Sequence, residues 1–153
     1  MLLFPAGYDK TRNSITTTVC TLMDYPEYWE RCAEDRAFVT KIMDEILRHS
    51  PVTAQFRIIT RDFEYNGVRF PKDAMMIFTS LGAGRDPAVF ENPLEIQPDR
   101  VSAHRHFAFG RGTHMCLGQH LVRTLMEESI HLITQRIKKP RLVGKVVRRP
   151  FLG

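Results

Sequence analysis

The sequence has no apolar run near the roughly 20 residues that a membrane-spanning helix needs, so no membrane span is expected. It also has no internal repeat and no low-complexity segment. Its apolar first four residues are interrupted by Pro5 and Gly7 and follow no basic leader, so we expect no signal peptide. With 153 residues, 43% hydrophobic and 25% charged, the composition is that of a globular protein able to bury a core.

Cysteine is scarce, and its three positions are far apart: Cys20, Cys32 and Cys116. No pair has the spacing of zinc ligands, and an odd number of distant cysteines suggests no disulfide framework. A reducing, cytoplasmic setting fits this usage best. Cys20 and Cys32 lie among apolar neighbours in helical stretches, which predicts that both pack in the core. Cys116 has different surroundings.

Basic residues exceed acidic ones by 22 to 17, which gives a net charge of +5. They are scattered, apart from two short runs at 138–141 and 145–149, and aromatic residues do not alternate with them. This distribution argues against nucleic-acid binding. A solvated face is the simplest interpretation of such runs, with an acidic protein partner as the alternative.

Helices dominate the predicted secondary structure. One is expected from Pro5 to about residue 23, and a second over 27–33. A third begins at the N-cap Asp35 and stops at Ser50-Pro51, with apolar residues at helical spacing. The clearest helix follows Gly118 and ends at Pro140; its apolar positions are Leu121, Leu125, Ile130 and Ile133.

A small antiparallel sheet is predicted between the third and fourth helices. Its strands are expected over 56–60, 63–65, 68–70 and 74–78, and Asn66-Gly67 is a strong hairpin-turn signal. Residues 82–106 follow as a long irregular stretch rich in Pro, Asp and Arg. Such loops are uncommon in compact domains and are usually functional.

The segment richest in chemistry is Phe109-Gly-Arg-Gly-Thr-His-Met-Cys-Leu-Gly118. Its three glycines, Gly110, Gly112 and Gly118, permit positive φ and close approach of the backbone to a flat or bulky group. Cys116 precedes a predicted helix, where free N–H groups and the helix dipole stabilise a thiolate. Phe109 could shield such a sulfur from water. Taken alone, Cys116 would more readily be interpreted as an inert buried cysteine.

This segment closely resembles the haem-binding loop of bacterial-type cytochromes P450, Phe-Gly-x-Gly-x-His-x-Cys-x-Gly. The resemblance implies haem b, with Cys116 as the iron ligand and with Phe109, Gly110 and Gly118 in its binding loop. It also implies a mainly helical fold with a small antiparallel sheet. The expected parts are the end of the distal helix, the Glu-x-x-Arg helix, a β-hairpin, the meander loop, the cysteine loop and the helix after it.

The same resemblance predicts that residues 1–153 form part of a single domain. In the family the catalytic domain is more than twice as long. The N-terminal half and the last strands would be missing here, so the chain would be a truncated gene product or a fragment.

Three charged residues are expected to support the cysteine loop. Glu45-Ile-Leu-Arg48 matches the family's Glu-x-x-Arg signature, and residues three apart share a helix face. In the family this pair is buried and joined by a later arginine, for which Arg100 is the candidate. The alternative is an exposed ion pair worth only about a few tenths of a kcal/mol.

Two cations, Arg57 and His114, match positions that contact the haem propionates in the family. Arginine and histidine both donate charge-assisted hydrogen bonds to carboxylates. From the residues alone, a surface arginine and an exposed loop histidine would be the preferred interpretations.

Ala6-Gly-Tyr-Asp-Lys-Thr11 resembles the family's distal-helix signature, with one departure. Asp9 occupies the acid position, Lys10 stands where a hydroxyl is expected, and Thr11 follows it. An ammonium has donors but no acceptor, so it cannot relay protons as a hydroxyl does unless burial lowers its pKa. The alternatives are that Asp9 and Lys10 pair outward, that oxygenation is uncoupled, that another haem-thiolate reaction occurs, or that the substrate assists the relay.

The implied activity is oxidation of a small apolar organic substrate with molecular oxygen and electrons from a separate redox protein. Arg105, Arg111 and Arg123 could dock an acidic ferredoxin or flavodoxin by complementary charge. Two alternatives stay open. One is a non-catalytic remnant that retains no haem, and the other is a haem-thiolate protein with non-oxygenase chemistry.

Overall fold

The computed structural model describes residues 3–144, so the basic run at 145–149 lies outside the described residues. The elements, in chain order, are α1 (Leu3–Leu22), α2 (Pro26–Glu34), α3 (Arg36–His49), β1 (Ala54–Ile58), β2 (Phe63–Tyr65), β3 (Val68–Phe70), β4 (Met75–Thr79), α4 (Ser80–Gly84) and α5 (Gln119–Arg136). Two short 3-10 turns, Ala103–Arg105 and Gly112–His114, interrupt the loop before α5.

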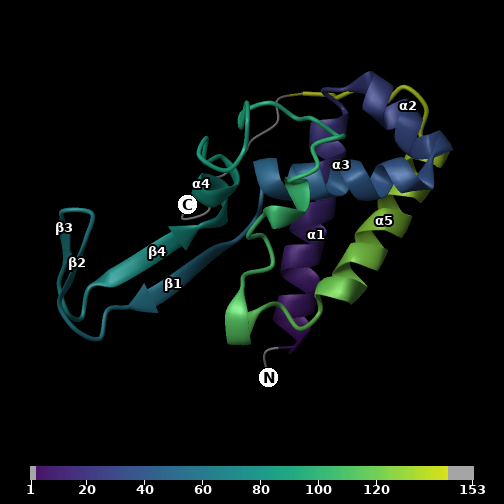
Figure 1. The fold of residues 1–153 in the computed structure, drawn as a ribbon. Helices are drawn as coiled ribbons and strands as arrows, with labels where there is room; N and C mark the ends of the chain where they lie inside the picture. Colours follow the sequence, from purple (N-terminus) through teal and green to yellow (C-terminus); the bar gives the residue numbers. More distant parts are fainter. Residues whose placement is uncertain (1–2, 145–153) are drawn as a thin grey trace.

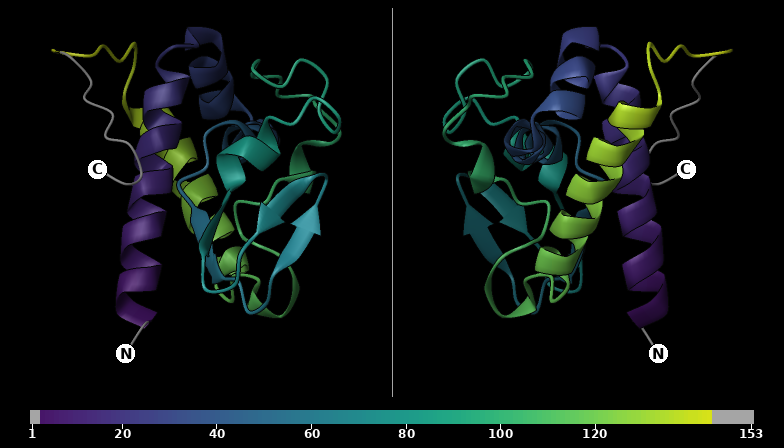
Figure 2. Two further views of the ribbon diagram at one scale, coloured as in Figure 1. Left: turned by 90° about the vertical axis from the view of Figure 1, so that its left-hand side faces the viewer. Right: turned by 90° about the vertical axis from the view of Figure 1, so that its right-hand side faces the viewer.

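The helices form the body of the molecule, and the strands project from it as a ribbon (Figure 1). α1 and α5 lie side by side, α3 crosses them, and α2 packs against α3 and α5 (Figures 1 and 2). Apolar residues from α1, α2, α3 and α5 fill the core between these helices, among them Leu22, Trp29, Phe38, Ile42, Met126 and Ile130. Of the described helices, none is long and apolar enough to cross a membrane.

α3 starts and stops where its sequence indicates. The Asp35 carboxylate accepts a hydrogen bond from the Ala37 N–H at 2.8 Å, which confirms the predicted N-cap. The face carrying Phe38, Ile42 and Ile46 is buried in the core. Of the two cysteines predicted to pack in the core, Cys32 is buried and Cys20 is only half-buried. Burial raises the pKa of the Cys32 thiol to about 12.

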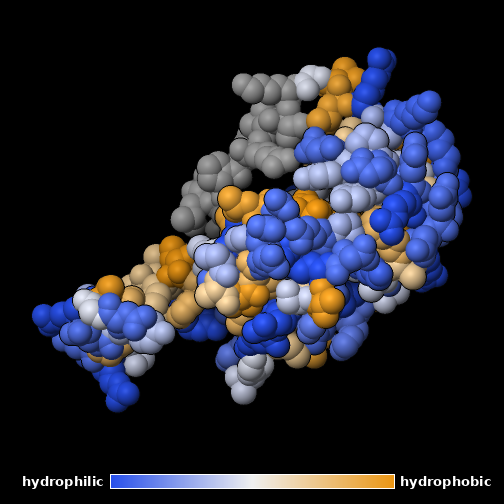
Figure 3. Space-filling view, turned by 45° about the horizontal axis from the view of Figure 1, so that its top comes forward, coloured by the Kyte–Doolittle hydropathy of each residue, from blue (hydrophilic) through white to orange (hydrophobic). Residues whose placement is uncertain are grey.

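The strands form two separate two-stranded antiparallel sheets where one was expected. β2 and β3 have the predicted bounds, and their turn places Asn66 at φ 51° and Gly67 at φ 75°, as a tight hairpin requires. β1 begins two residues earlier than expected, because Ala54 and Gln55 pair with Thr79 and Phe78 despite their weak strand preference. Hydrophobic surface is visible along the ribbon between hairpin and body (Figure 3).

Two helical features differ from expectation. The short helix α4 was not predicted, since Ser-Leu-Gly-Ala-Gly has little helix propensity. α5 ends at Arg136, before Pro140, because Ile137 is extended and its carbonyl accepts the Trp29 indole N–H at 3.0 Å. Along α5, Ile130 is buried, but Leu121 and Leu125 are exposed.

Gly84, the last residue of α4, allows this helix to lie directly against α3. A Cβ at Gly84 would come within 2.0 Å of the Arg48 carbonyl oxygen, whereas one at Gly7, in the middle of α1, would meet nothing within 4 Å. Gly84→Ala should therefore lower the free energy of unfolding by at least about 1–3 kcal/mol. Gly7→Ala is the control and should stabilise α1 by about 0.5–1 kcal/mol. Urea titration measures both; full stability in Gly84→Ala would contradict the packing described.

Candidate functional site

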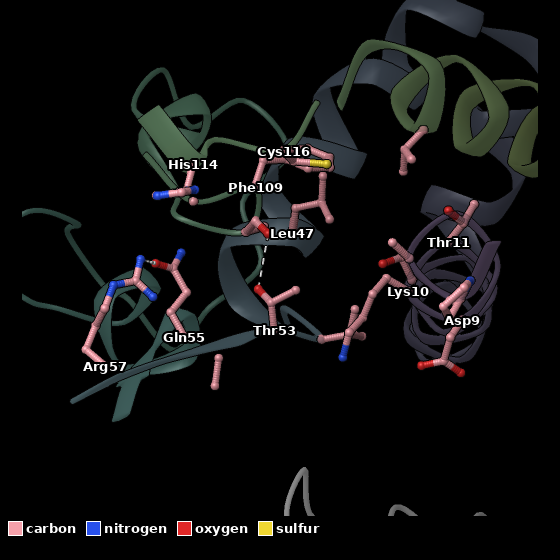
Figure 4. A pocket seen from close by; sticks show the side chains of 18 residues that line it. Asp9, Lys10, Thr11, Leu47, Thr53, Gln55, Arg57, Phe109, His114 and Cys116 are labelled. Carbon is pink, nitrogen blue, oxygen red and sulfur yellow. Dashed lines mark hydrogen bonds between the residues drawn. The ribbon is translucent and has the colours of Figure 1, made fainter. Parts of the chain in front are cut away.

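A pocket of about 1050 Å³ lies between α1, β1 and the loop that carries Cys116 (Figure 4). Its lining brings together residues far apart in the sequence. The candidates that contribute to it are Asp9, Lys10 and Thr11 from α1, Arg57 from β1, and Phe109, Gly110, His114 and Cys116 from the loop. The remaining candidates do not line the pocket: Gly118, Glu45, Arg48 and Arg100.

Backbone hydrogen bonds fold the cysteine loop into a compact turn. The Cys116 N–H donates to the Phe109 carbonyl at 2.9 Å, and the Gly110 N–H donates to the Phe107 carbonyl at 2.9 Å. Gly110 and Gly112 have φ values of 70° and 74°, which side-chain-bearing residues rarely adopt. Cys116 is half-buried, and its sulfur projects from the loop toward the side of the pocket bounded by α1 (Figure 4).

Two details of this loop differ from expectation. Gly118 has φ −88°, so it does not need the positive φ assigned to it; it is the N-cap residue of α5. The amide of Cys116 is also not free, since the Phe109 carbonyl accepts its hydrogen. Gly112 and Gly118 share one property that suits a bulky neighbour, because a Cβ on either would meet no atom within 4 Å.

Glu45 lies at the centre of a buried polar network, where it and Arg48 have fully buried side chains. Arg48 binds both carboxylate oxygens of Glu45 at 2.7 and 2.8 Å. The structure places Arg100 on the same carboxylate, with Nε 3.0 Å from Oε1, and the Gln97 N–H donates to it at 2.9 Å. One carboxylate thus accepts hydrogen bonds from donors on α3 and on the loop that precedes Cys116.

The two arginines of this network also hold the irregular loop through its carbonyls. Arg48 donates to Gly84, Pro93 and Glu95, at 2.6, 2.8 and 2.8 Å. Arg100 donates to the carbonyls of Glu91 and Asn92. The loop over residues 85–100 is therefore fixed by buried charge, without regular secondary structure.

The two cations expected near propionates, Arg57 and His114, line the same pocket and have exposed side chains. Arg57 donates to the Phe56 carbonyl at 2.8 Å and to the Gln55 side-chain oxygen at 3.5 Å. Both cations lie on the side of the pocket opposite α1 (Figure 4). They could therefore bind the acidic edge of one ligand together.

On the α1 side, the Asp9 carboxylate accepts hydrogen bonds from Arg12 at 3.2 Å and from Asn13 at 3.4 Å. Lys10 is exposed and lines the pocket. Thr11 is buried, and its hydroxyl oxygen has no hydrogen-bond partner among the described residues. A buried hydroxyl without a partner is costly, so this wall of the pocket suits a ligand or water that can hydrogen-bond to it.

Sequence reasoning missed a second polar cluster behind the cysteine loop. Arg123, expected to face a redox partner, forms an ion pair with Asp44. His106 lies 3.5 Å from the same carboxylate. Arg105 and Arg111 remain exposed. The sequence offered one hint of this cluster: Asp44 directly precedes Glu45, the acid of the Glu-x-x-Arg signature.

The site fits a large cofactor that brings most of its own metal ligands. Within residues 3–144, no three His, Cys, Asp or Glu side chains converge to hold a metal ion. Cys116 offers one thiolate, which is all that a porphyrin-bound iron requires on one face. The pocket volume is at the upper end of the range of about 300–1,000 Å³ usual for cofactor sites.

The cytochrome P450 family model matches residues 1–138 of this chain. The chain belongs to the cytochrome P450 family. This finding confirms the resemblance drawn from the cysteine loop, and with it the mainly helical fold with a small antiparallel component. Members of this family carry a haem, and they use redox partners and organic substrates.

Among curated proteins, the chain is 35% identical to a vitamin D3 dihydroxylase of Streptomyces griseolus, over 98% of this chain and 38% of the relative. It is 31% identical to a luteothin monooxygenase of Streptomyces thioluteus, over 97% of this chain and 37% of the relative. The chain thus spans little more than a third of the length of these relatives.

This chain also matches only about a third of the length of the solved structures that resemble it. Cytochrome P450 CREJ in complex with (4-ethylphenyl) dihydrogen phosphate superposes with a TM-score of 0.83 at 30% identity, over 88% of this chain and 34% of that one. Ligand-free Mycobacterium smegmatis CYP164A2 superposes with a TM-score of 0.82 at 29% identity. This match also covers 88% of this chain and 34% of that one.

The Glu45 network makes a quantitative prediction. Glu45→Gln keeps the shape of the side chain but leaves two buried arginines without their counter-charge, so it should lower the free energy of unfolding by about 3–5 kcal/mol. Asp99→Asn is the control, because the Lys41–Asp99 pair is exposed and screened by solvent, so this variant should leave the free energy of unfolding nearly unchanged. Equal losses in a denaturant titration would show that the buried network contributes no more than a surface pair.

Proposed function

We propose that this chain is the cysteine-bearing part of a haem-thiolate monooxygenase. The enzyme inserts one atom of O2 into a small apolar organic substrate, with electrons from a separate redox protein. The observation that carries the proposal is the pocket itself, which brings Cys116, two cations and the α1 segment around one space large enough for a cofactor.

The cofactor proposed is haem b, whose iron would be held by the Cys116 thiolate. When bound, it supplies oxygen activation, which electron donation from a thiolate favours. His114 and Arg57 donate hydrogen bonds to its propionates, and Phe109, Gly110 and Gly118 belong to the loop that faces it. The open space beside Gly112 and Gly118 supports a close approach of the loop backbone to a flat ring.

On the α1 side, the small side chain of Ala6 lines the pocket and would leave room for oxygen beside the cofactor, and the residues that follow would handle protons. Asp9 is the proposed acid. Thr11 has a buried hydroxyl that can both donate and accept, which Lys10 cannot do as an ammonium. The pocket wall thus retains a hydroxyl next to the position where the family signature has one.

The names of the relatives support oxygen insertion, since one is a dihydroxylase and another a monooxygenase. The electron donor proposed is an acidic ferredoxin or flavodoxin. It would meet Arg105 and Arg111, the two exposed arginines near the cysteine loop. The setting proposed is cytoplasmic.

A second candidate function is haem-thiolate chemistry other than oxygen insertion. The observation that favours it is Lys10, which lines the pocket at the position where a proton-relaying hydroxyl is expected. Lys10→Thr separates the two functions. If oxygen insertion is the reaction, this variant should increase product formed per reductant consumed, because the hydroxyl restores a donor and an acceptor. An unchanged ratio would remove Lys10 from the mechanism.

The cofactor assignment is tested on the full-length product of the gene that encodes this chain. The reduced protein with carbon monoxide should give the red-shifted absorption of thiolate-bound haem. Cys116→Ser should abolish that band. Cys20→Ser, which alters a half-buried cysteine on α1, is the control and should keep it. A wild-type protein that takes up no haem, or a Cys116→Ser variant with an unchanged spectrum, would contradict the proposal.

A further inference from the structure

We propose that Asp44, His106 and Arg123 form a second brace, separate from the Glu45 network, which positions the cysteine loop for iron ligation. This inference rests on the proposed function. The three residues come from α3, from the segment leading into the loop, and from α5. We call them the Asp44 brace.

The brace is built around one carboxylate. Arg123 pairs with Asp44 through its guanidinium, and the His106 Nε2 lies 3.5 Å from the Asp44 Oδ1. The side chains of His106, Asp44 and Arg123 are 3%, 19% and 25% exposed, so all three are largely removed from water. Burial raises the pKa of Asp44, but hydrogen bonds from His106 and Arg123 outweigh it and leave the pKa below its usual value.

A backbone hydrogen bond sets the role of one His106 nitrogen. The Ala108 N–H can only donate, and it lies 3.2 Å from the His106 Nδ1, so Nδ1 is the acceptor. In a neutral imidazole the proton is then on Nε2, the nitrogen that faces Asp44. The Arg123 Nη2 lies 3.3 Å from the same nitrogen, so the three side chains form one compact cluster. The carboxylate therefore receives donors from both neighbours.

Phe109 transmits the position of the brace to Cys116. Its ring lies against the His106 ring, with centroids 5.9 Å apart, and the Arg123 guanidinium lies over it, 5.1 Å from its centroid. The backbone carbonyl of the same Phe109 accepts the Cys116 N–H at 2.9 Å. A shift of the brace would move the ring, then the carbonyl, and then the residue that carries the sulfur.

A simpler role would be to hold α3 against α5. The Arg36–Glu128 pair also joins α3 and α5, with exposed side chains, and it touches neither His106 nor Phe109. This pair is therefore the matched control. If the Asp44 brace only joins the helices, removing either pair should affect the cysteine loop equally little.

The test compares Asp44→Asn with Glu128→Gln in the full-length protein, by hydrogen exchange and by the carbon monoxide spectrum. Asp44→Asn should speed exchange of the Gly110 and Cys116 amides by about tenfold or more, since a charge-assisted hydrogen bond is lost. It should also reduce the thiolate-type fraction of the bound haem. Glu128→Gln should change neither. Arg123→Gln, at a more exposed position, is the second variant if Asp44→Asn does not fold.

The outcomes separate the two proposals. If the wild-type protein lacks the thiolate band, the proposed function fails. The exchange rates of the loop amides then show by themselves whether the Asp44 brace holds the cysteine loop. If wild type has the band and the Asp44 and Glu128 variants match in both measurements, the brace is overturned and the proposed function stands. Faster loop exchange with a lowered thiolate fraction, confined to the Asp44 and Arg123 variants, supports both.

Discussion

The fold depends on one buried carboxylate. Glu45 is fully removed from water, and such a charge is tolerated only when donors surround it. Arg48, Arg100 and the Gln97 N–H supply them, and each of the last two comes from a loop with no regular structure of its own. Burial of the charge and ordering of the loop are therefore a single event, and the cysteine loop follows directly along the chain.

The next residue on α3 gives this helix a second organising role. Consecutive side chains on a helix point in different directions. Glu45 accordingly meets the irregular loop, whereas Asp44 meets His106 and Arg123. Two neighbouring carboxylates thus fix two successive segments, and both segments converge on the turn that presents Cys116.

Features set by local chemistry could be predicted from the sequence. The Asp35 cap, the Asn66-Gly67 hairpin and the pairing of Glu45 with Arg48 all follow from residues within a few positions of one another. Arg100 lies 55 residues from Glu45, and only resemblance to a family indicated it. The end of α5 could not be predicted, because it depends on a hydrogen bond from Trp29, more than a hundred residues away. The contact of His106 with Asp44 also joins residues far apart in the sequence.

The central claim is that the sulfur of Cys116 is bonded to iron in the complete protein. X-ray absorption at the iron K-edge, on the full-length product purified with its haem, tests this bond without reference to activity. The account predicts one sulfur scatterer in the first coordination shell, beside the porphyrin nitrogens. A shell made of nitrogen and oxygen alone would contradict it.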